Sequence, residues 1–358
     1  MSKILIIHDR FKFRGGAERL VLIMARGLNA DIATEYWNEE ESFRKSEAPA
    51  KVIVLGKQIR HAGLSYFSAQ GRFFWKTKFL KDYDTIIFSG NNCLSAAWRA
   101  PEKKKVMYCH TPVRYAYDLK DHYYRSKVWW KKPMFIFFVF IARIIYQWGI
   151  KKMDKVIANS LNVQARLSRF CGIDSYVIYP PIDDKKFKWL GQDNFYLSFA
   201  RLDELKRVDD VIRAFKKLPQ KNLIIASGGP EYDKLKKMIV RHKNIELLGF
   251  VSDEKLANLV GNCIASIYIP LHEDFGMSPL EAAAAGKPTI GVDEGGLKET
   301  ITHKVTGYLV PSVYSNNDLV EAINWLDPAK ASGMNGDCKR QAEKFSKEKF
   351  VSEIEKVL

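Results

Sequence analysis

The chain has 358 residues, a length that suits two domains better than one. Hydrophobic residues make up 47% of it and aromatic residues 13%, which excludes global disorder and allows sizeable cores. The formal net charge of +16 indicates an anionic partner, either nucleic acid, an acidic membrane or phosphorylated ligands, unless it is the ordinary surplus of a basic protein.

Cysteine usage and the N-terminal residues indicate the compartment. The five cysteines are scattered, and no two of them form a Cys-x-x-Cys pair: Cys93, Cys109, Cys171, Cys263 and Cys338. This pattern argues against a disulfide framework or a zinc site and is typical of a reducing environment. The apolar run Ile4–Ile7 is too short for a signal peptide. We therefore expect a cytoplasmic protein.

The first half of the chain alternates strands and helices. A strand predicted at Lys3–Ile7 is followed by the glycines Gly15 and Gly16 and by a helix that ends near Leu28. Four later apolar runs are short and bounded by polar residues, as is typical of buried parallel strands: Lys51–Leu55, Thr85–Phe88, Lys105–Cys109 and Lys155–Ala158.

One long apolar stretch, Pro133–Ile150, follows Trp129-Trp130-Lys131-Lys132. A membrane-spanning helix needs about 20 apolar residues, and Arg143 would cost about 2.5–3.5 kcal/mol at the bilayer centre, so we reject that interpretation. Two interpretations remain, a buried core helix or a helix lying on a membrane surface. We favour the core helix, although the basic and aromatic segment Arg72–Phe79 supports the membrane surface.

The second half resumes the alternation after Tyr179-Pro180-Pro181, where two prolines interrupt regular structure. The pattern predicts doubly wound α/β domains at 1–182 and 183–340, and a charged helix within 341–358 that we expect to pack back on the first domain. The strands and helices expected in the second domain are, in order, Phe195–Ala200, Val208–Leu218, Asn222–Ala226, Tyr232–Arg241, Ile245–Leu248, Asp253–Val260, Ala265–Ile269 and Ser278–Ala285.

The segment Pro270–Glu281 carries the clearest chemical signal. It follows a buried strand and enters a helix, so it lies where open α/β sheets bind ligands, and the helix start offers free N–H groups to phosphate or sugar oxygens. Glu273 in the loop and Glu281 in the helix can accept hydrogen bonds from two parts of one extended ligand. For either glutamate taken alone, a solvated surface position is the favoured interpretation.

Two cations flank the end of an earlier strand. Arg201 and Lys206 can converge on a diphosphate, the arginine as a bidentate fork and the lysine as a point charge, or they can be surface charge. In the first half, Gly15 and Gly16 let a ligand approach the backbone, although they are not part of a G-x-G-x-x-G motif. His110 ends a strand and is either a site residue or a structural histidine.

Together these segments resemble glycosyltransferase family four, whose members have the GT-B fold: two Rossmann-like doubly wound parallel-sheet domains that face a central cleft. The resemblance covers nearly the whole chain, and its motifs occur in the expected order. They are Gly15–Arg19, His110-Thr111-Pro112, Ala158-Asn159-Ser160, Tyr179–Asp183, Phe199–Lys206, Ser227–Glu231, Leu248–Val251, Glu273–Glu281 and Gly295–Glu299.

The resemblance implies a role for each site residue. His110, Glu273, Arg201 and Lys206 would be catalytic, with Arg201 and Lys206 holding the donor diphosphate and His110 near the reacting centre. Glu273 would contact the donor sugar and Glu281 the ribose. The other donor-binding positions would be Gly15, Gly16, Phe250, Val251, Asp274, Phe275, Gly276, Met277, Ser278 and Leu280.

The resemblance also implies transfer with retention of anomeric configuration, assisted by the leaving phosphate, without a side-chain nucleophile and without a metal. Transferases of the GT-A type hold a divalent ion with an Asp-x-Asp motif, which Asp82-Tyr83-Asp84 matches literally. Because this triplet directly precedes the buried strand Thr85–Phe88, we interpret it as a chance match.

Within the family, His110–Asp118 resembles mannosyltransferases of surface-polysaccharide assembly, such as O-antigen biosynthesis. These use GDP-mannose and a lipid-diphosphate-linked glycan acceptor, which Arg114 and Tyr115 would contact at an anionic membrane surface on the inner face of the cell membrane. Alternatives are a UDP-sugar-dependent transferase or epimerase of the same fold and a non-catalytic nucleotide-sugar-binding protein. Nucleic-acid binding would explain the charge but none of the motifs, so we expect no nucleic-acid partner.

Overall fold

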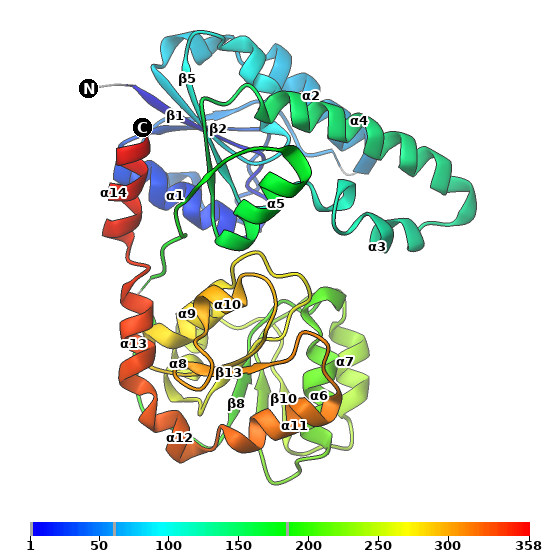
Figure 1. Ribbon diagram of the computed structural model, residues 1–358, viewed down its shortest axis with the longest axis vertical. Helices are drawn as coiled ribbons and strands as arrows, with labels where there is room; N and C mark the ends of the chain where they lie inside the picture. Colours follow the sequence, from blue (N-terminus) through cyan, green and yellow to red (C-terminus); the bar gives the residue numbers. More distant parts are fainter. Residues whose placement is uncertain (1–2, 60–61, 184–185) are drawn as a thin grey trace. The chain divides into compact units, whose positions relative to one another are not determined.

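The computed structural model describes residues 3–59, 62–183 and 186–358. Within them the chain forms two compact units, drawn in Figure 1. Unit 1 comprises Met1–Pro180 and Phe350–Leu358, and unit 2 comprises Pro181–Lys349. Unit 2 is therefore inserted, in sequence terms, between the main part of unit 1 and its last segment.

The described part of unit 1 is built on a seven-stranded parallel sheet with the order β3-β2-β1-β4-β5-β6-β7. Short hydrophobic runs form the central strands, and Ile6 of β1 lies opposite Ile87 of β4. The strand bounds are β1 Ile4–His8, β2 Asp31–Thr34, β3 Val52–Val54, β4 Thr85–Ser89, β5 Lys104–Cys109, β6 Lys155–Ala158 and β7 Tyr176–Val177.

Helices lie against both faces of this sheet, and each face has its own buried apolar cluster. Local signals set the helix ends: Ser160 accepts a hydrogen bond from the N–H of Val163 at the start of α5, and Gly172 ends it in the left-handed conformation. The helices are α1 Gly16–Leu28, α2 Ala62–Trp75, α3 Lys120–Arg125, α4 Lys132–Ile150 and α5 Leu161–Cys171.

The last helix, α14 Lys347–Val357, contributes its apolar face to unit 1. Phe350 and Ile354 are buried in the cluster that also contains Ile6 and Tyr108, and the ring of Phe350 meets that of Tyr108 edge-on at 5.9 Å. Lys155 of β6 donates to the carbonyl of Val357 at 2.7 Å. The amphipathic pattern read from the C-terminal sequence is thus used to complete the core of unit 1.

The described part of unit 2 contains a six-stranded parallel sheet with the order β10-β9-β8-β11-β12-β13. Its strands are β8 Tyr196–Ser198, β9 Leu223–Ile225, β10 Ile245–Leu247, β11 Ser266–Ile267, β12 Thr289–Val292 and β13 Gly307–Val310. Its helices are α6 Val208–Lys216, α7 Tyr232–Ile239, α8 Asp253–Asn262, α9 Met277–Ala284, α10 Leu297–Thr300, α11 Asn316–Trp325, α12 Pro328–Gly333 and α13 Asn335–Glu343. The prediction of two doubly wound parallel-sheet domains is confirmed.

The preference for a buried core helix at Pro133–Ile150 is wrong for most of its length. Among the described residues, Trp129–Ile150 is the helical segment long and apolar enough, by length and composition, to cross a membrane, yet only 28% of its most apolar window is buried. Val139, Ala142, Tyr146, Gly149 and Ile150 pack inward. The remaining face is exposed because the helix has too little protein beside it to cover an apolar surface on all sides, and Figure 1 shows α4 extending beside α2 and α3.

Candidate active site

Most of the unit 2 residues predicted to hold the donor lie in the segments that follow β8 and β11, including the first turns of α9, whereas Phe250 and Val251 follow β10. Lys206 closes a single 3₁₀ turn, Glu204–Lys206, after β8, and Glu273 lies in the loop between β11 and α9. Parallel pairing of β8 with β11 brings these two loops to the same edge of the sheet. Residues 67 positions apart in the sequence thereby become neighbours.

Lys206, Tyr268 and Glu273 form one hydrogen-bonded cluster. The Lys206 Nζ lies 2.6 Å from the Glu273 Oε2 and 2.8 Å from the Tyr268 hydroxyl, which itself donates to the same carboxylate oxygen at 2.7 Å. The Lys206 and Glu273 side chains are only 24% and 18% exposed, so water screens this ion pair less than a surface pair. The cluster therefore holds a cation and a carboxylate in direct contact within one mostly buried site.

The charges of this cluster reinforce one another. Burial opposes the charged form of Lys206, but contact with Tyr268 and Glu273 outweighs it and raises the pKa of the lysine. Burial, together with the neighbouring Glu273 charge, raises the pKa of the Tyr268 hydroxyl. At neutral pH the lysine is therefore a cation and the tyrosine a neutral hydrogen-bond donor. Tyr268 was missed by the sequence analysis, because it lies within the predicted strand Ala265–Ile269, where a tyrosine is ordinarily a core residue.

The loop between β11 and α9 is held in shape by its own backbone and by a second loop. His272 has a φ of 54° and its N–H donates to Glu294 at 3.0 Å, while Gly276, at φ 91°, precedes the first turn of α9. A Cβ on Gly296 would lie 2.3 Å from the Asp274 carbonyl oxygen, so only glycine allows this close approach. The start of α9 is thereby fixed relative to Glu273.

The remaining predicted donor residues of unit 2 differ in exposure. Phe275, Gly276 and Leu280 are buried, with Phe275 against Phe345 at 5.6 Å, whereas the other four of the loop and helix are half-buried: Asp274, Met277, Ser278 and Glu281. Arg201 is exposed after β8. Phe250 is 83% exposed, Val251 is half-buried, and the Phe250 ring lies so close to Gly228 that a Cβ there would be only 2.2 Å away.

A second group of predicted residues lies in unit 1, around His110 at the end of β5. His110 Nε2 is 2.8 Å from the Ser89 hydroxyl, and its ring lies edge-on to Tyr108 at 5.3 Å and to His8 at 6.3 Å. Burial, with a smaller contribution from His8, lowers the pKa of His110 to about 3. The imidazole is therefore neutral at physiological pH and serves as a hydrogen-bonding group rather than a cation.

Gly15 and Gly16 form the start of α1, with Gly15 as the N-cap and Glu18 in the first turn. Earlier in the same loop, the Asp9 carboxylate accepts hydrogen bonds of 2.8 to 2.9 Å from three consecutive backbone N–H groups after β4, those of Asn91, Asn92 and Cys93. The sequence analysis did not single out Asp9. Its signal is its position directly after β1, at the carboxyl edge of the sheet.

The two residues predicted to contact the acceptor have structural partners. Arg114 Nε donates to the Thr111 hydroxyl at 3.3 Å, and Tyr115 stacks on Phe138 of α4 with ring centroids 5.5 Å apart. Tyr115 therefore connects the loop after His110 to Phe138 on the face of α4 that packs against unit 1. The predicted role in acceptor binding stays a prediction.

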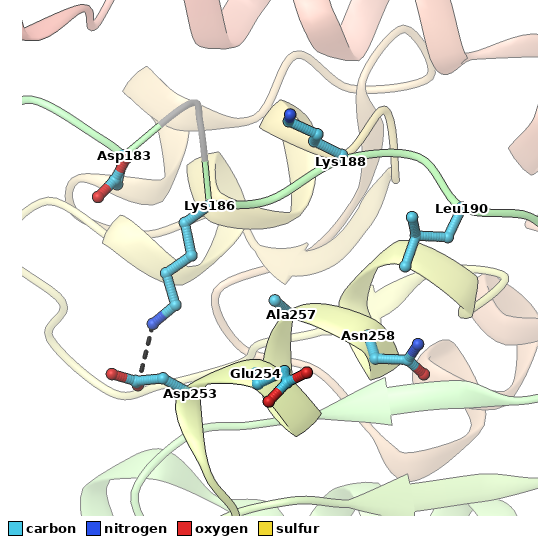
Figure 2. Close-up of a pocket in the computed structure, with 8 residues that line it drawn as sticks. All are labelled: Asp183, Lys186, Lys188, Leu190, Asp253, Glu254, Ala257 and Asn258. Carbon is cyan, nitrogen blue, oxygen red and sulfur yellow. Dashed lines mark hydrogen bonds and ion pairs between the residues drawn. The ribbon is translucent and has the colours of Figure 1, made fainter.

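Two surface pockets lie away from these clusters. One of about 1060 Å³ opens at the carboxyl ends of β1, β2 and β3, and its lining includes the cations Arg10, Lys12 and Lys57 as well as the acidic run 39–41. A second, of about 720 Å³, lies between the segment after Asp183 and α8 in unit 2, where Lys186 pairs with Asp253 at 2.9 Å (Figure 2). The second pocket contains none of the predicted site residues.

The Asp-x-Asp triplet has a structural role. Asp84 accepts a hydrogen bond from the backbone N–H of Lys3 at 2.7 Å, and the Tyr83 hydroxyl donates to Asp31 at 2.7 Å. Both bonds therefore hold the chain at the amino ends of β1, β2 and β4. Within residues 3–59, 62–183 and 186–358, no three His, Cys, Asp or Glu side chains are grouped as metal ligands.

Two family models identify the family of this chain, and solved structures show the same fold. Residues 14–186 match the family described as Glycosyltransferase Family 4, and residues 181–345 match the one described as Glycosyl transferases group 1. The chain is a family 4 glycosyltransferase with the GT-B fold. It therefore belongs to the enzymes that transfer sugars, as the order of its motifs predicted.

Individual relatives are distant. Over 396 residues the glycosyltransferase is 26% identical to the human alpha-1,3/1,6-mannosyltransferase ALG2, covering 95% of this chain and 92% of that protein. It superimposes on HepE of Anabaena, solved with UDP-glucose, at a TM-score of 0.77 with 20% identity and full coverage of both chains. The sucrose-phosphate synthase of Thermosynechococcus elongatus gives 0.80 at 18% identity, covering 99% and 98%. At such identities the solved structures establish the fold alone.

Removing one member of the Lys206 cluster should separate binding from catalysis. Lys206→Ala removes a charge-assisted contact of about 1.5–3 kcal/mol and should weaken nucleoside diphosphate binding accordingly, measured by titration calorimetry. Glu273→Ala should abolish sugar transfer while the variant still binds the free nucleoside diphosphate. Unchanged nucleotide affinity in Lys206→Ala, or normal turnover in Glu273→Ala, would contradict these assignments.

The depressed pKa of His110 predicts a pH dependence of stability. The unfolded chain binds a proton at this histidine below about pH 6.5 and the folded protein does so only near pH 3, so the stabilisation is fully present above pH 6.5 and is lost as the pH falls toward 3. His110→Asn should flatten the slope of unfolding free energy with pH by up to about 1.4 kcal/mol per pH unit in this window. Chemical denaturation at several pH values tests this, and equal slopes would show that His110 is not held neutral.

Proposed function

We propose that this glycosyltransferase moves mannose from GDP-mannose onto a lipid-diphosphate-linked glycan, with retention of configuration, during surface-polysaccharide assembly. The observation that carries the proposal is the cluster of Lys206, Tyr268 and Glu273 at the carboxyl edge of the unit 2 sheet. A cation beside a carboxylate matches a donor that is itself two-part, with an anionic diphosphate next to a sugar rich in hydroxyls.

The proposed chemistry follows from these charges. The donor diphosphate competes with Glu273 for the Lys206 cation, and the carboxylate then accepts hydrogen bonds from sugar hydroxyls. Lys206 and Arg201 stabilise the negative charge that develops on the leaving diphosphate as the glycosidic bond breaks. A leaving phosphate oxygen takes the proton of the attacking acceptor hydroxyl on the same face of the sugar, which accounts for retention without a protein nucleophile.

The mannose assignment is supported by similarity to the mannosyltransferase ALG2, which extends over 95% of the chain. GDP is proposed from the resemblance of His110–Asp118 to mannosyltransferases that use GDP-mannose. A UDP-sugar donor is the second candidate, and it is favoured by the structural likeness to HepE solved with UDP-glucose. The two candidates differ in the base, which Phe250 and Val251 would contact. Nucleotide selectivity therefore distinguishes them.

Acceptor recognition is proposed for unit 1. The pocket at the ends of β1, β2 and β3 has three cations for a phosphorylated ligand and carboxylates for glycan hydroxyls. The exposed side of α4 adds a surface for the lipid: Phe137 is 65% and Phe140 60% exposed, and Trp129 and Trp130 stand at the start of the helix beside Lys131. An apolar helix face with tryptophan and lysine at its end matches the interface of an anionic membrane.

Titration of the wild-type protein with GDP, UDP and ADP, each without added metal, tests the donor assignment. GDP should bind selectively, and Arg201→Ala should lose most of that binding, since in the proposed site the guanidinium binds the diphosphate as a bidentate fork. Selective UDP binding would replace the mannose proposal with the UDP-sugar candidate. Absence of binding to all three nucleotides would refute the proposed donor site.

Vesicle flotation tests the membrane surface. The wild-type protein should bind vesicles that contain anionic phospholipid, with binding that weakens in high salt. Phe137→Ser with Phe140→Ser should reduce binding at least about tenfold, because burying one such side chain stabilises by about 1.5–3 kcal/mol. Val240→Ser, which alters a residue of unit 2 that is 78% exposed, is the matched control and should bind as wild type. Equal binding by all three proteins would exclude α4 as the membrane contact.

A further inference from the structure

Arg207, the residue that follows Lys206, has an unfavourable backbone conformation. It ends the 3₁₀ turn that carries Lys206 and is the N-cap of α6, with φ 49° and ψ 36°, in the left-handed region. Glycine adopts this region freely, whereas an arginine there is strained by its Cβ. A strained residue persists where the surrounding contacts outweigh the strain, so the side-chain contacts of Arg207 indicate what holds it in place.

The guanidinium of Arg207 connects the two loops of the donor site. Its Nε donates to the carbonyl of Ile269 at 2.7 Å and its Nη2 donates to the carbonyl of Pro270 at 2.9 Å. These carbonyls lie between Tyr268 and Glu273 in the sequence. The N–H of Leu271 donates in return to the carbonyl of Leu205 at 2.7 Å, so the loop of Lys206 and the loop of Glu273 are joined from both sides.

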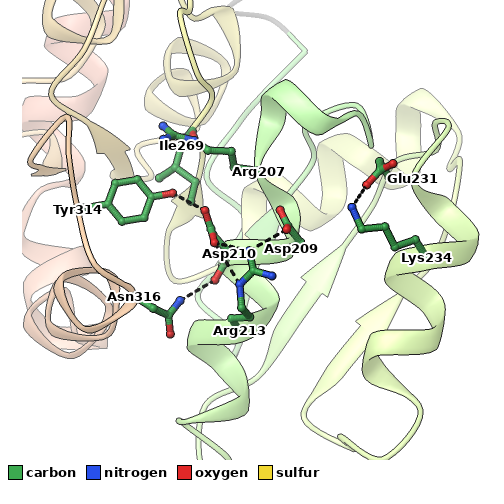
Figure 3. Close-up of polar contacts among 9 residues, drawn as sticks. All are labelled: Arg207, Asp209, Asp210, Arg213, Glu231, Lys234, Ile269, Tyr314 and Asn316. Carbon is green, nitrogen blue, oxygen red and sulfur yellow. Dashed lines mark hydrogen bonds and ion pairs between the residues drawn. The ribbon is translucent and has the colours of Figure 1, made fainter. Parts of the chain in front are cut away.

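The guanidinium of Arg207 also contacts an aromatic ring on the segment before α11. It lies over the Tyr314 ring at 5.0 Å, and the Tyr314 hydroxyl donates to the Asp210 Oδ2 at 2.8 Å (Figure 3). Asn316 donates to the Asp210 backbone carbonyl at 3.1 Å, which ties the start of α11 to α6. The planar fork of an arginine suits this position, because it donates to two carbonyls while its face rests on an aromatic ring.

We propose that Arg207 is a positioning residue, which holds the loop of Lys206 against the loop of Tyr268 and Glu273 through its hydrogen bonds to Ile269 and Pro270. It thereby keeps the Lys206 ammonium beside Tyr268 and Glu273. This inference rests on the proposed function of the same site. Arg207 acts through backbone carbonyls and not on the donor, so its loss leaves the charges of the site in place. Its effect falls on the alignment needed in the transition state, where small displacements of a charged group lower the rate strongly.

Two substitutions test the proposal. Arg207→Gly removes the guanidinium and favours the left-handed backbone, so the variant should fold with a melting temperature close to that of wild type. Arg207→Lys retains a positive charge but replaces the two-pronged donor with one ammonium. Arg340→Ala is the matched control, because Arg340 is an exposed arginine of unit 2 that pairs with Asp337 on its own helix, away from the contacts of Arg207.

Steady-state kinetics with GDP-mannose and with UDP-glucose should separate alignment from binding. In Arg207→Gly we expect kcat to fall about 10- to 100-fold, with the donor KM and the calorimetric Kd for GDP or UDP within about threefold of wild type. The kcat of Arg207→Lys should fall between those of Arg207→Gly and wild type, and the kcat of Arg340→Ala should match that of wild type. A wild-type kcat in both Arg207 variants would overturn the proposal. So would a loss of nucleotide affinity as large as the loss of kcat, because Arg207 would then bind the donor itself.

Hydrogen exchange provides a readout that needs no turnover. In Arg207→Gly the peptide spanning 268–276 should exchange faster than in wild type, because this loop loses the two guanidinium bonds to Ile269 and Pro270 and keeps only the Leu271 N–H bond to Leu205. Peptides from α11 should be unchanged. Unchanged exchange in 268–276 would overturn the positioning role. If the wild-type protein turns over neither donor, the proposed function fails, and the exchange measurement still decides the role of Arg207.

Discussion

The proposed donor site depends on the ion pair between Lys206 and Glu273. Two opposite charges, each mostly buried, are stable there only because each has the other and both contact Tyr268. Breaking such a pair by removing one partner leaves an uncompensated charge, whereas a ligand that carries both an anion and hydroxyl groups can satisfy both ends. The same desolvation that makes the pair sensitive to mutation strengthens its interaction with an anionic ligand.

The surrounding fold can be understood as the means of holding this pair. Parallel strands β8 and β11 are neighbours, so the loops that follow them emerge at one edge. Close glycine contact at Gly296 fixes the loop of Glu273 from one side, and the bond from Leu271 to Leu205 fixes it from another. Precision at this edge comes from backbone contacts between loops, which are less tolerant of change than exposed side-chain contacts.

Much of this architecture could be predicted from the sequence. Apolar runs alternating with amphipathic segments indicate a parallel α/β fold, and Lys206, Glu273 and His110 follow predicted strands. The pairing of Lys206 with Glu273 could not be predicted, because it depends on which strands are neighbours, and β11 keeps only Ser266–Ile267 of the expected Ala265–Ile269. Tyr268 resembles a core residue in sequence, and Arg207 resembles surface charge until its φ of 49° is known. For α4, apolar composition alone did not distinguish a buried helix from an exposed one.

The sequence position of α14 bears on the order in which the protein forms during synthesis. Residues of unit 2 lie between the main part of unit 1 and Phe350–Leu358, and Phe350 and Ile354 fill the core of unit 1. When a ribosome has made the first 180 residues, the apolar surface that these two side chains will cover is still open to water. Unit 2 can fold once its own residues have emerged, whereas the core of unit 1 is completed only when α14 has been made. The nascent chain thus carries an uncovered apolar surface through about the second half of translation, the condition in which chaperones and aggregation compete for it.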